Sequence, residues 1–197
     1  QSVDFFKSFV SDPFLFGKIA ANHCLNDLYA TNAEPRSAQV IATVPFGTAL
    51  SMEEQLFQLM SGLVHVLNEN DVSLLGGHTS EGNALAMGLC VNGYGEQDSL
   101  FRKSGAQPGD ALILTHPIGS GCIFAADMRA KAEGSWVREA VAQMLQSRKE
   151  ARDAFAAHRA TACTDITGFG LLGHLVELLT ASGVDATINF DDIPVLA

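Results

Sequence analysis

The segment from Thr161 to Asp185 holds the residues best suited to chemistry. A short apolar stretch leads into Asp165, glycines follow at 168, 170 and 173, and an apolar pattern with helical spacing then begins. This order predicts a carboxylate at the end of a strand, beside a glycine-rich turn at a helix N-terminus. Backbone N–H groups and the helix dipole favour an anion there, and a carboxylate can hold a divalent cation. The segment therefore indicates magnesium and phosphate chemistry.

The same glycines have a second interpretation, in which they only allow the helix to pack closely against a sheet. Their order fits neither G-x-x-x-x-G-K-[ST] nor G-x-G-x-x-G after a strand, which excludes the common P-loop and dinucleotide-binding motifs. From the spacing alone, both interpretations of the segment stay open.

Strands and helices alternate in the part of the chain that precedes this segment. Asp12 followed by Pro13 predicts the start of a helix, which is expected over 13–30. The other expected elements are a strand over 37–45, a helix from a Ser51–Glu54 capping box to about 69, and strands over 72–77 and 84–95 around the loop GHTSEGN. Because few crossovers separate these strands, a mixed sheet is expected.

The turn QPGD at 107–110 is the best candidate for a domain boundary, which gives domains over 1–106 and 107–197. In the second domain, strands are expected over 111–115, 160–165 and 184–190. Helices are expected from PIGSG to about 131, over 135–157 and over 170–182, the last capped by Gly183. The expected fold class is α+β, with two mixed α/β domains.

The composition fits a soluble α/β protein, and the unpaired cysteines favour a cytoplasmic location. The 197 residues are 47% hydrophobic, and no apolar run is long enough to span a membrane. The N-terminal residues show no basic region followed by an apolar stretch, so no signal peptide is expected in this sequence. A net charge of −10 argues against nucleic-acid binding, since no basic patch would offset phosphate repulsion. The four cysteines form no C-x-x-C pair and are expected to be reduced, mostly buried thiols: Cys24, Cys90, Cys122 and Cys163.

Five stretches, in order along nearly the whole chain, resemble the selenophosphate synthetase family. They are VDFF (3–6), DPFLFGKIAANHCLNDLYA (12–30), LLGGHTSEG (74–82), RKSGAQPGDALILTHPIGSG (102–121) and ACTDITGFGLLGHL (162–175). Aminoimidazole ribonucleotide synthetase and thiamine monophosphate kinase belong to the same wider family. The sequence motifs TDITGFGLLGHL and GGHTSE favour selenophosphate synthetase over these relatives.

The resemblance implies a reaction in which selenide, ATP and water give selenophosphate, AMP and phosphate, with Mg²⁺. Asp4 matches a nucleotide-contacting carboxylate, Asp27 matches one that holds magnesium and meets the phosphates, and Asp165 matches a further magnesium ligand. The remaining nucleotide-contacting positions that the resemblance implies are a turn at Gly76, Gly77 and His78, and an asparagine near the phosphates at Asn22.

The resemblance also implies a homodimer paired through its N-terminal strands, and a second domain with a ferredoxin-like split sheet, truncated in this chain. The family's reactive Cys or selenocysteine and its essential Lys are expected upstream, so no catalytic residue is assigned here. The chain begins without Met, in what resembles a strand end, and stops at FDDIPVLA. It is therefore expected to be a fragment that is inactive alone.

Several of these positions also have ordinary structural interpretations. An isolated aspartate is typical of a cap or a surface, and His78 is also compatible with a loop histidine bonded to the backbone. Glu81 either contacts nucleotide or caps a turn, while His174 is expected to be structural. Thr31, Asn32 and Ala33 replace the family's glycine-containing turn, and Asn tolerates the glycine conformation whereas Thr does not.

Two alternative functions follow from these considerations. One is a related ATP-dependent enzyme of a purine or thiamine pathway, and the other is a non-catalytic nucleotide-binding or dimerisation module.

Overall fold

The computed structural model describes residues 1–196, which divide into two compact units. The first unit comprises 1–29 and 33–96, and the second comprises 30–32 and the described chain from 97 onward. Among the described residues, none of the helices is both long and apolar enough to cross a membrane.

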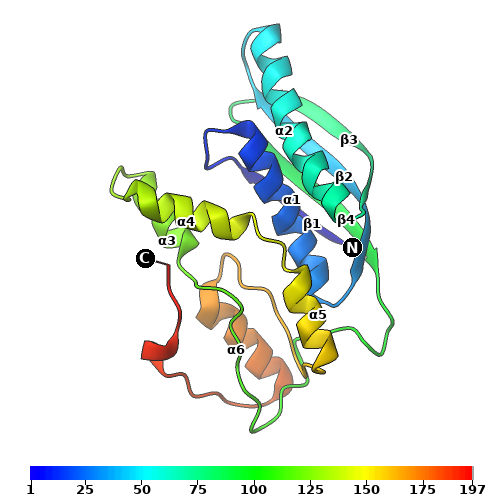
Figure 1. The fold of residues 1–197 in the computed structure, drawn as a ribbon, viewed down its shortest axis with the longest axis vertical. Helices are drawn as coiled ribbons and strands as arrows, with labels where there is room; N and C mark the ends of the chain where they lie inside the picture. The colour runs from blue at the N-terminus through cyan, green and yellow to red at the C-terminus, as the bar shows by residue number, and fades with distance from the viewer. Residues whose placement is uncertain (197) are drawn as a thin grey trace. The chain divides into compact units, whose positions relative to one another are not determined.

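A four-stranded mixed sheet forms the centre of the first unit, as predicted (Figure 1). Its order is β1-β4-β2-β3, with β4 antiparallel to both of its neighbours and β2 parallel to β3. The strands are β1 (Ser2–Lys7), β2 (Glu34–Pro45), β3 (Ser73–Gly82) and β4 (Ala86–Tyr94). The expected strands are therefore confirmed, apart from the length of β3.

Strand β3 continues through the stretch that was expected to be a loop. Gly76 to Gly82 pair in parallel register with Gln39 to Pro45 of β2, after a bulge between Ala38 and Gln39. The prediction of a turn at Gly76–His78 is wrong because the neighbouring strand supplies hydrogen-bond partners that outweigh the turn propensity of a Gly-Gly pair.

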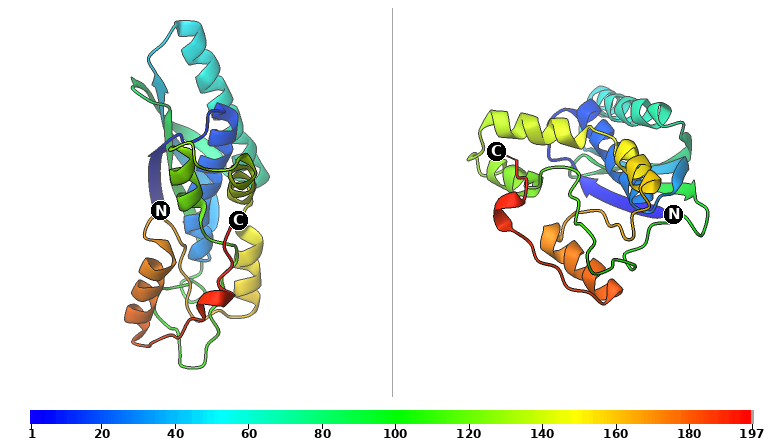
Figure 2. Two further views of the ribbon diagram at one scale, coloured as in Figure 1. Left: turned by 90° about the vertical axis from the view of Figure 1, so that its left-hand side faces the viewer. Right: turned by 60° about the horizontal axis from the view of Figure 1, so that its bottom comes forward.

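Two helices cover one face of this sheet, as Figures 1 and 2 show. Helix α1 (Pro13–Ala30) begins where predicted, and the Asp12 carboxylate accepts the Leu15 N–H at 3.0 Å. Helix α2 (Ala49–Glu69) ends where predicted but begins two residues before Ser51. Its N-cap is Thr48, whose hydroxyl accepts the Ser51 N–H at 3.3 Å, so the prediction of Ser51 as the cap is wrong.

The two helices approach each other closely through glycines. A Cβ on Gly17 would lie 2.1 Å from the Leu59 carbonyl oxygen, and one on Gly62 would lie 2.0 Å from that of Phe14. Any larger side chain would push the helices apart, so both positions require glycine. Around this contact lies the core of the first unit, whose fully buried side chains include Phe16, Leu25, Leu63, Met87 and Leu89.

Alternation along the strands gives the sheet two different faces. Asp4, Leu89 and Val40 are paired across three strands, so their side chains lie on the face beneath the helices. The next row, Phe5–Gly88–Ile41–His78, lies on the opposite face. That face exposes apolar side chains: Val3 is 68% exposed, Phe5 53% and Ile41 51%.

Helices and irregular segments make up the described part of the second unit. The helices are α3 (Ser120–Asp127), α4 (Gly134–Met144), α5 (Lys149–Ala157), α6 (Gly170–Ser182) and the 3₁₀ turn η1 (Phe190–Asp192). Helix α6 and its left-handed Gly183 cap confirm the prediction. The helix expected over 135–157 is in fact two helices, and the helix from PIGSG ends at Asp127 rather than near 131.

The three strands expected in the second unit are not formed. Residues 111–115, 160–165 and 184–189 are irregular, Phe190 begins the 3₁₀ turn η1, and one isolated bridge joins Ile118 to Val195 among the described residues. Apolar β-branched sequence favours a strand only where a partner supplies the ladder. The ferredoxin-like sheet is therefore not confirmed. The C-terminal end of α6 instead holds irregular chain: the Ser182 hydroxyl accepts the N–H groups of Gly105 and Ala106 at 3.1 and 3.2 Å.

All four cysteines are free thiols, as predicted. Cys24 is buried, Cys90 and Cys163 are half-buried, and Cys122 is exposed, so the expectation of burial is wrong for Cys122. Burial raises the pKa of the Cys24 thiol to about 12, which keeps it protonated and unreactive.

Candidate functional site

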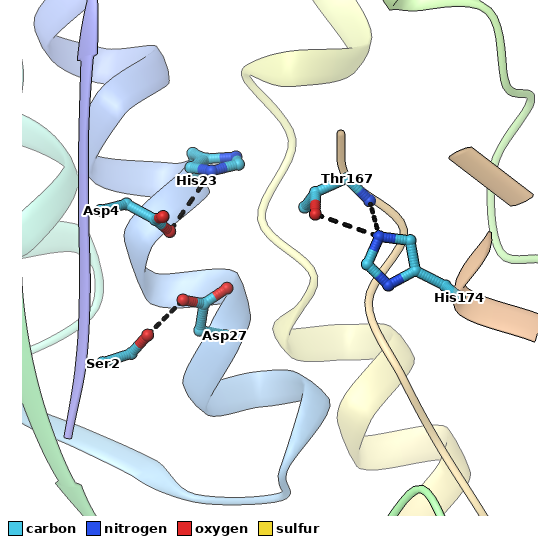
Figure 3. A network of polar contacts seen from close by, with 6 residues as sticks. All are labelled: Ser2, Asp4, His23, Asp27, Thr167 and His174. Carbon is cyan, nitrogen blue, oxygen red and sulfur yellow. Dashed lines mark hydrogen bonds and ion pairs between the residues drawn. The ribbon is translucent and has the colours of Figure 1, made fainter. Parts of the chain in front are cut away.

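Four polar side chains of the first unit meet between β1 and α1, as Figure 3 shows. Ser2 and Asp4 are two residues apart on β1, so they share the face beneath the helix. His23 and Asp27 are four residues apart on α1, so they lie one turn apart on one side of it. The periods of a strand and a helix thus bring two carboxylates together from distant parts of the sequence.

Each carboxylate has one polar partner within this cluster. The Asp4 carboxylate lies 3.4 Å from Nε2 of His23, and both side chains are about a third exposed, at 36% and 37%. The Ser2 hydroxyl donates a hydrogen bond to the Asp27 carboxylate. These contacts orient the two carboxylates while leaving them in reach of solvent.

The environment of Asp27 disfavours its charged form. Burial is the largest cause and raises the pKa of the carboxyl above its ordinary value of 3.8, and the nearby Asp4 raises it further. The hydrogen bond from Ser2 and the positive potential of His23 oppose the shift. A divalent cation beside Asp27 and Asp4 would favour both ionised carboxylates, so the electrostatics suit a metal-binding position.

The donor atoms around Asp27 fit magnesium. They are carboxylate and hydroxyl oxygens, which are the hard ligands that Mg²⁺ prefers. Asn26 also has a buried Oδ1 with no hydrogen-bond partner, but consecutive residues of a helix do not face each other, so it is not counted with these donors. Within residues 1–196, however, no group of three or more His, Cys, Asp or Glu side chains is already gathered to hold a metal. The pair is therefore a partial ligand set.

Asp165, the other predicted magnesium ligand, belongs to the second unit. It is half-buried in irregular chain before α6, where the strand predicted to end at Asp165 is not formed. The predicted pair of Asp27 and Asp165 is thus divided between the two units, and neither unit contains both residues.

Three of the other predicted nucleotide contacts, Gly76, Gly77 and His78, lie on a strand at the opposite edge of the sheet from Asp4. His78 lies in β3, at the opposite edge of the sheet from β1, and in a row on the opposite face. Gly76 and Gly77 precede it in the same edge strand. Asn22 is 4% exposed, and its amide donates to the Lys18 carbonyl of the preceding helical turn at 3.2 Å.

A separate cavity of about 610 Å³ lies between α2 and the ends of β2 and β3. Val44, Met52 and Leu56 supply its apolar lining, and Glu53, Thr79, Ser80 and Glu81 are its polar residues. Glu81 therefore faces this cavity, and none of the predicted nucleotide or metal residues does.

Sequence reasoning missed Ser2 and His23. The spacing of both residues could have identified them. Ser2 precedes Asp4 by two residues in a strand, and His23 precedes Asp27 by four residues in a helix. Once Asp4 and Asp27 are candidates, these two offsets identify the residues that share their faces.

The pKa of Asp27 predicts a pH-dependent effect of Asp27→Asn on stability. Because the folded chain holds this proton more tightly than the unfolded chain, the contribution of Asp27 to stability is greatest at low pH. It falls as the pH rises through the raised pKa. Urea unfolding without added metal should show the variant to be more stable than the parent at pH 8, with the gain shrinking toward pH 4.

Asp71→Asn is the matched control, since Asp71 is exposed in a turn with a φ of 55° that asparagine tolerates. Parallel stability curves for the parent and Asp27→Asn across this pH range would show that Asp27 has an ordinary pKa.

Two domain-family models match the chain. The N-terminal domain of AIR synthase related protein matches residues 1–95, and the C-terminal domain of AIR synthase related protein matches residues 107–197. Only 96–106, between the two, is left unmatched.

Curated relatives cover the whole chain. It is 39% identical over 197 residues to "Selenide, water dikinase 2" of Peptoclostridium acidaminophilum, across 100% of this chain and 56% of that protein. It is 36% identical over 199 residues to the selenide, water dikinase of Myxococcus xanthus, with the same shares covered. The chain thus spans about half the length of the curated relatives it matches.

Solved structures share the fold at low identity. Thiamine-monophosphate kinase from Stenotrophomonas maltophilia K279a matches with a TM-score of 0.84 and 21% identity, over 98% of this chain and 64% of that one. The hydrogenase maturation protein HypE of E. coli matches with a TM-score of 0.76 and 17% identity, over 99% and 62%. With both domain models in order along the sequence, this chain belongs to the AIR synthase related family.

Proposed function

We propose that the protein to which this chain belongs makes selenophosphate from selenide and ATP, releasing AMP and phosphate. The observation that carries the proposal is the identity of 32–39% to relatives named selenide, water dikinase, along essentially the whole chain. The meeting of Asp4 and Asp27 in the first unit supports it, since phosphoryl transfer from ATP needs carboxylates that hold a metal.

In this proposal the carboxylates have separate roles. Asp4 contacts the nucleotide, and Asp27 and Asp165 hold Mg²⁺, which when bound neutralises charge on the phosphates. Ser2 and His23 orient Asp27 and Asp4 through the contacts described above. Gly76, Gly77, His78 and Asn22 remain proposed nucleotide contacts.

The turn that departs from the family pattern is compatible with this role. Asn32 adopts a φ of 57°, the left-handed conformation that glycine otherwise provides. Its amide donates to the Ser99 carbonyl at 2.8 Å, and the Phe101 N–H donates to the Thr31 carbonyl at 3.1 Å. Asparagine therefore replaces glycine here without loss of the turn.

The alternative functions have weaker support than selenophosphate synthesis. The similarity to thiamine-monophosphate kinase and HypE is below 25% identity and shows the fold alone. A non-catalytic module would not need the paired carboxylates of Asp4 and Asp27. Four free thiols fit a reducing compartment, so a cytoplasmic location is part of the proposal.

The full-length protein should release AMP from ATP when selenide is added, in the presence of Mg²⁺. Asp165→Asn should lower this rate by about a hundredfold or more while the protein stays folded, because a metal ligand is lost. Separate detection of AMP and of ADP, with selenide, thiamine monophosphate and an aminoimidazole ribonucleotide precursor as separate substrates, distinguishes the alternatives, because transfer of only the γ-phosphoryl group leaves ADP. Turnover confined to one of the latter two would refute selenophosphate synthesis.

We further propose that the open face of the sheet forms a homodimer. Val3 and Phe5 on β1 and Ile41 on β2 project from that face on either side of β4, which contributes Gly88 between them, and all three are more than half exposed. An apolar patch of this kind on a regular sheet is typical of a protein interface, and a second copy would present the same patch to it.

The charged variants Phe5→Glu and Ile41→Glu should weaken dimerisation by about tenfold or more, because each buries an unpaired charge at the interface. Size-exclusion chromatography with light scattering over a concentration series measures the effect. Phe57→Glu is the control, since Phe57 is 64% exposed but lies on α2. A parent that is monomeric at all concentrations, or Phe57→Glu alone being disruptive, would contradict this interface.

A further inference from the structure

We propose that His174 is the positioning residue for Asp165, and that it acts as a neutral imidazole protonated on Nδ1. His174 lies in the first turns of α6 and is only 5% exposed. The part of the inference that concerns metal rests on the proposed function of Asp165, whereas the part that concerns the histidine does not.

The hydrogen bonds of His174 determine its protonation. Its Nε2 lies 3.1 Å from the backbone nitrogen of Thr167 and 3.2 Å from the Thr167 hydroxyl (Figure 3). A backbone N–H can only donate, so Nε2 must be the acceptor and carry no proton. The proton of the neutral ring is then on Nδ1.

This contact is one of the hydrogen bonds that restrain the irregular segment around Asp165, and the Thr161 hydroxyl donates another to the Asp110 carboxylate at 2.7 Å. Residues 161–169 form no strand, so no ladder fixes them. On one side of Asp165, the Cys163 N–H donates to the Arg102 carbonyl at 2.9 Å, and on the other the Thr167 N–H donates to His174. These two bonds lie two residues before and two residues after Asp165, and together they fix the backbone that carries its carboxylate.

Packing alone does not explain why this position is a histidine, because the second ring nitrogen has no partner. Nδ1 of His174 is buried and has no hydrogen-bond partner, and the same holds for Oγ1 of Thr164 on the restrained segment. An unsatisfied buried donor is costly, and an apolar ring of similar size would fill the space without that cost. An apolar ring would, however, lack the Nε2 acceptor that binds the Thr167 N–H.

The inference predicts a specific nitrogen signature in the full-length protein. Two-dimensional ¹⁵N spectra should show His174 with Nδ1 protonated and Nε2 unprotonated, the less common neutral form. The Thr167 amide should exchange slowly with solvent. His174→Phe keeps the ring but removes the acceptor, and should speed that exchange by about tenfold or more. His174→Gln, which retains an acceptor oxygen, should preserve protection better than His174→Phe.

Metal affinity tests the consequence for Asp165. Mn²⁺ in place of Mg²⁺, titrated with ATP and followed by electron paramagnetic resonance, should bind His174→Phe about tenfold more weakly than the parent, a loss typical of removed outer-shell contacts. His174→Gln should recover most of the affinity. Leu178→Ala is the control: Leu178 is buried on the same helix, so its loss lowers stability without removing the bond to Thr167.

The outcomes separate the two claims. A proton on Nε2, or unchanged Thr167 exchange in His174→Phe, would overturn the assignment of the bond. Equal losses of Mn²⁺ affinity in His174→Phe and Leu178→Ala would overturn the positioning role, because general destabilisation would explain both. Failure of the parent to release AMP with selenide would refute the proposed function and leave both of these measurements valid.

Discussion

The packing of β1 against α1 is the interaction on which the candidate site depends. It places Asp4, on the helix-facing side of an edge strand, beside the helical turn that carries His23 and Asp27. Burial of the Asp27 carboxylate, and to a smaller extent its repulsion by Asp4, raise the pKa of Asp27 and make its charged form costly. The close contact of α1 with α2 at Gly17 and Gly62 fixes the position of α1. Packing in the core of the first unit therefore offsets the unfavourable free energy of placing two carboxylates close together.

Local signals in the sequence were sufficient for much of the first unit. Asp12 and Pro13 define the start of α1 because a carboxylate cap and a fixed φ act within one turn. The β-branched run of β2 is likewise a local feature, and so, in the second unit, is the left-handed Gly183 after α6. The pairing of Asp4 with Asp27 was not local, and only the resemblance to a known family singled out both residues.

The predictions that failed depended on partners distant in the sequence. GGHTSE has the composition of a loop, yet it is strand because β2 lies alongside it. Conversely, 160–165 has the composition of a strand and is irregular because no ladder forms there. The contact of the His174 ring with Thr167, seven residues earlier, was not predicted either, because it crosses a turn whose shape the glycines leave undetermined. Strand pairing and the geometry of turns determine whether such segments form strands, and neither can be predicted from residue types alone.

The central claim is that Asp4 and Asp27 together hold a metal-bound nucleotide. Titration of the full-length protein with Mn²⁺ and a non-hydrolysable ATP analogue, followed by electron paramagnetic resonance, tests it most directly. The account predicts that Asp4→Asn and Asp27→Asn each weaken binding of the metal–nucleotide complex by about tenfold or more, while Asp71→Asn binds as the parent does. Binding of the complex with parental affinity by both Asp4→Asn and Asp27→Asn would contradict it.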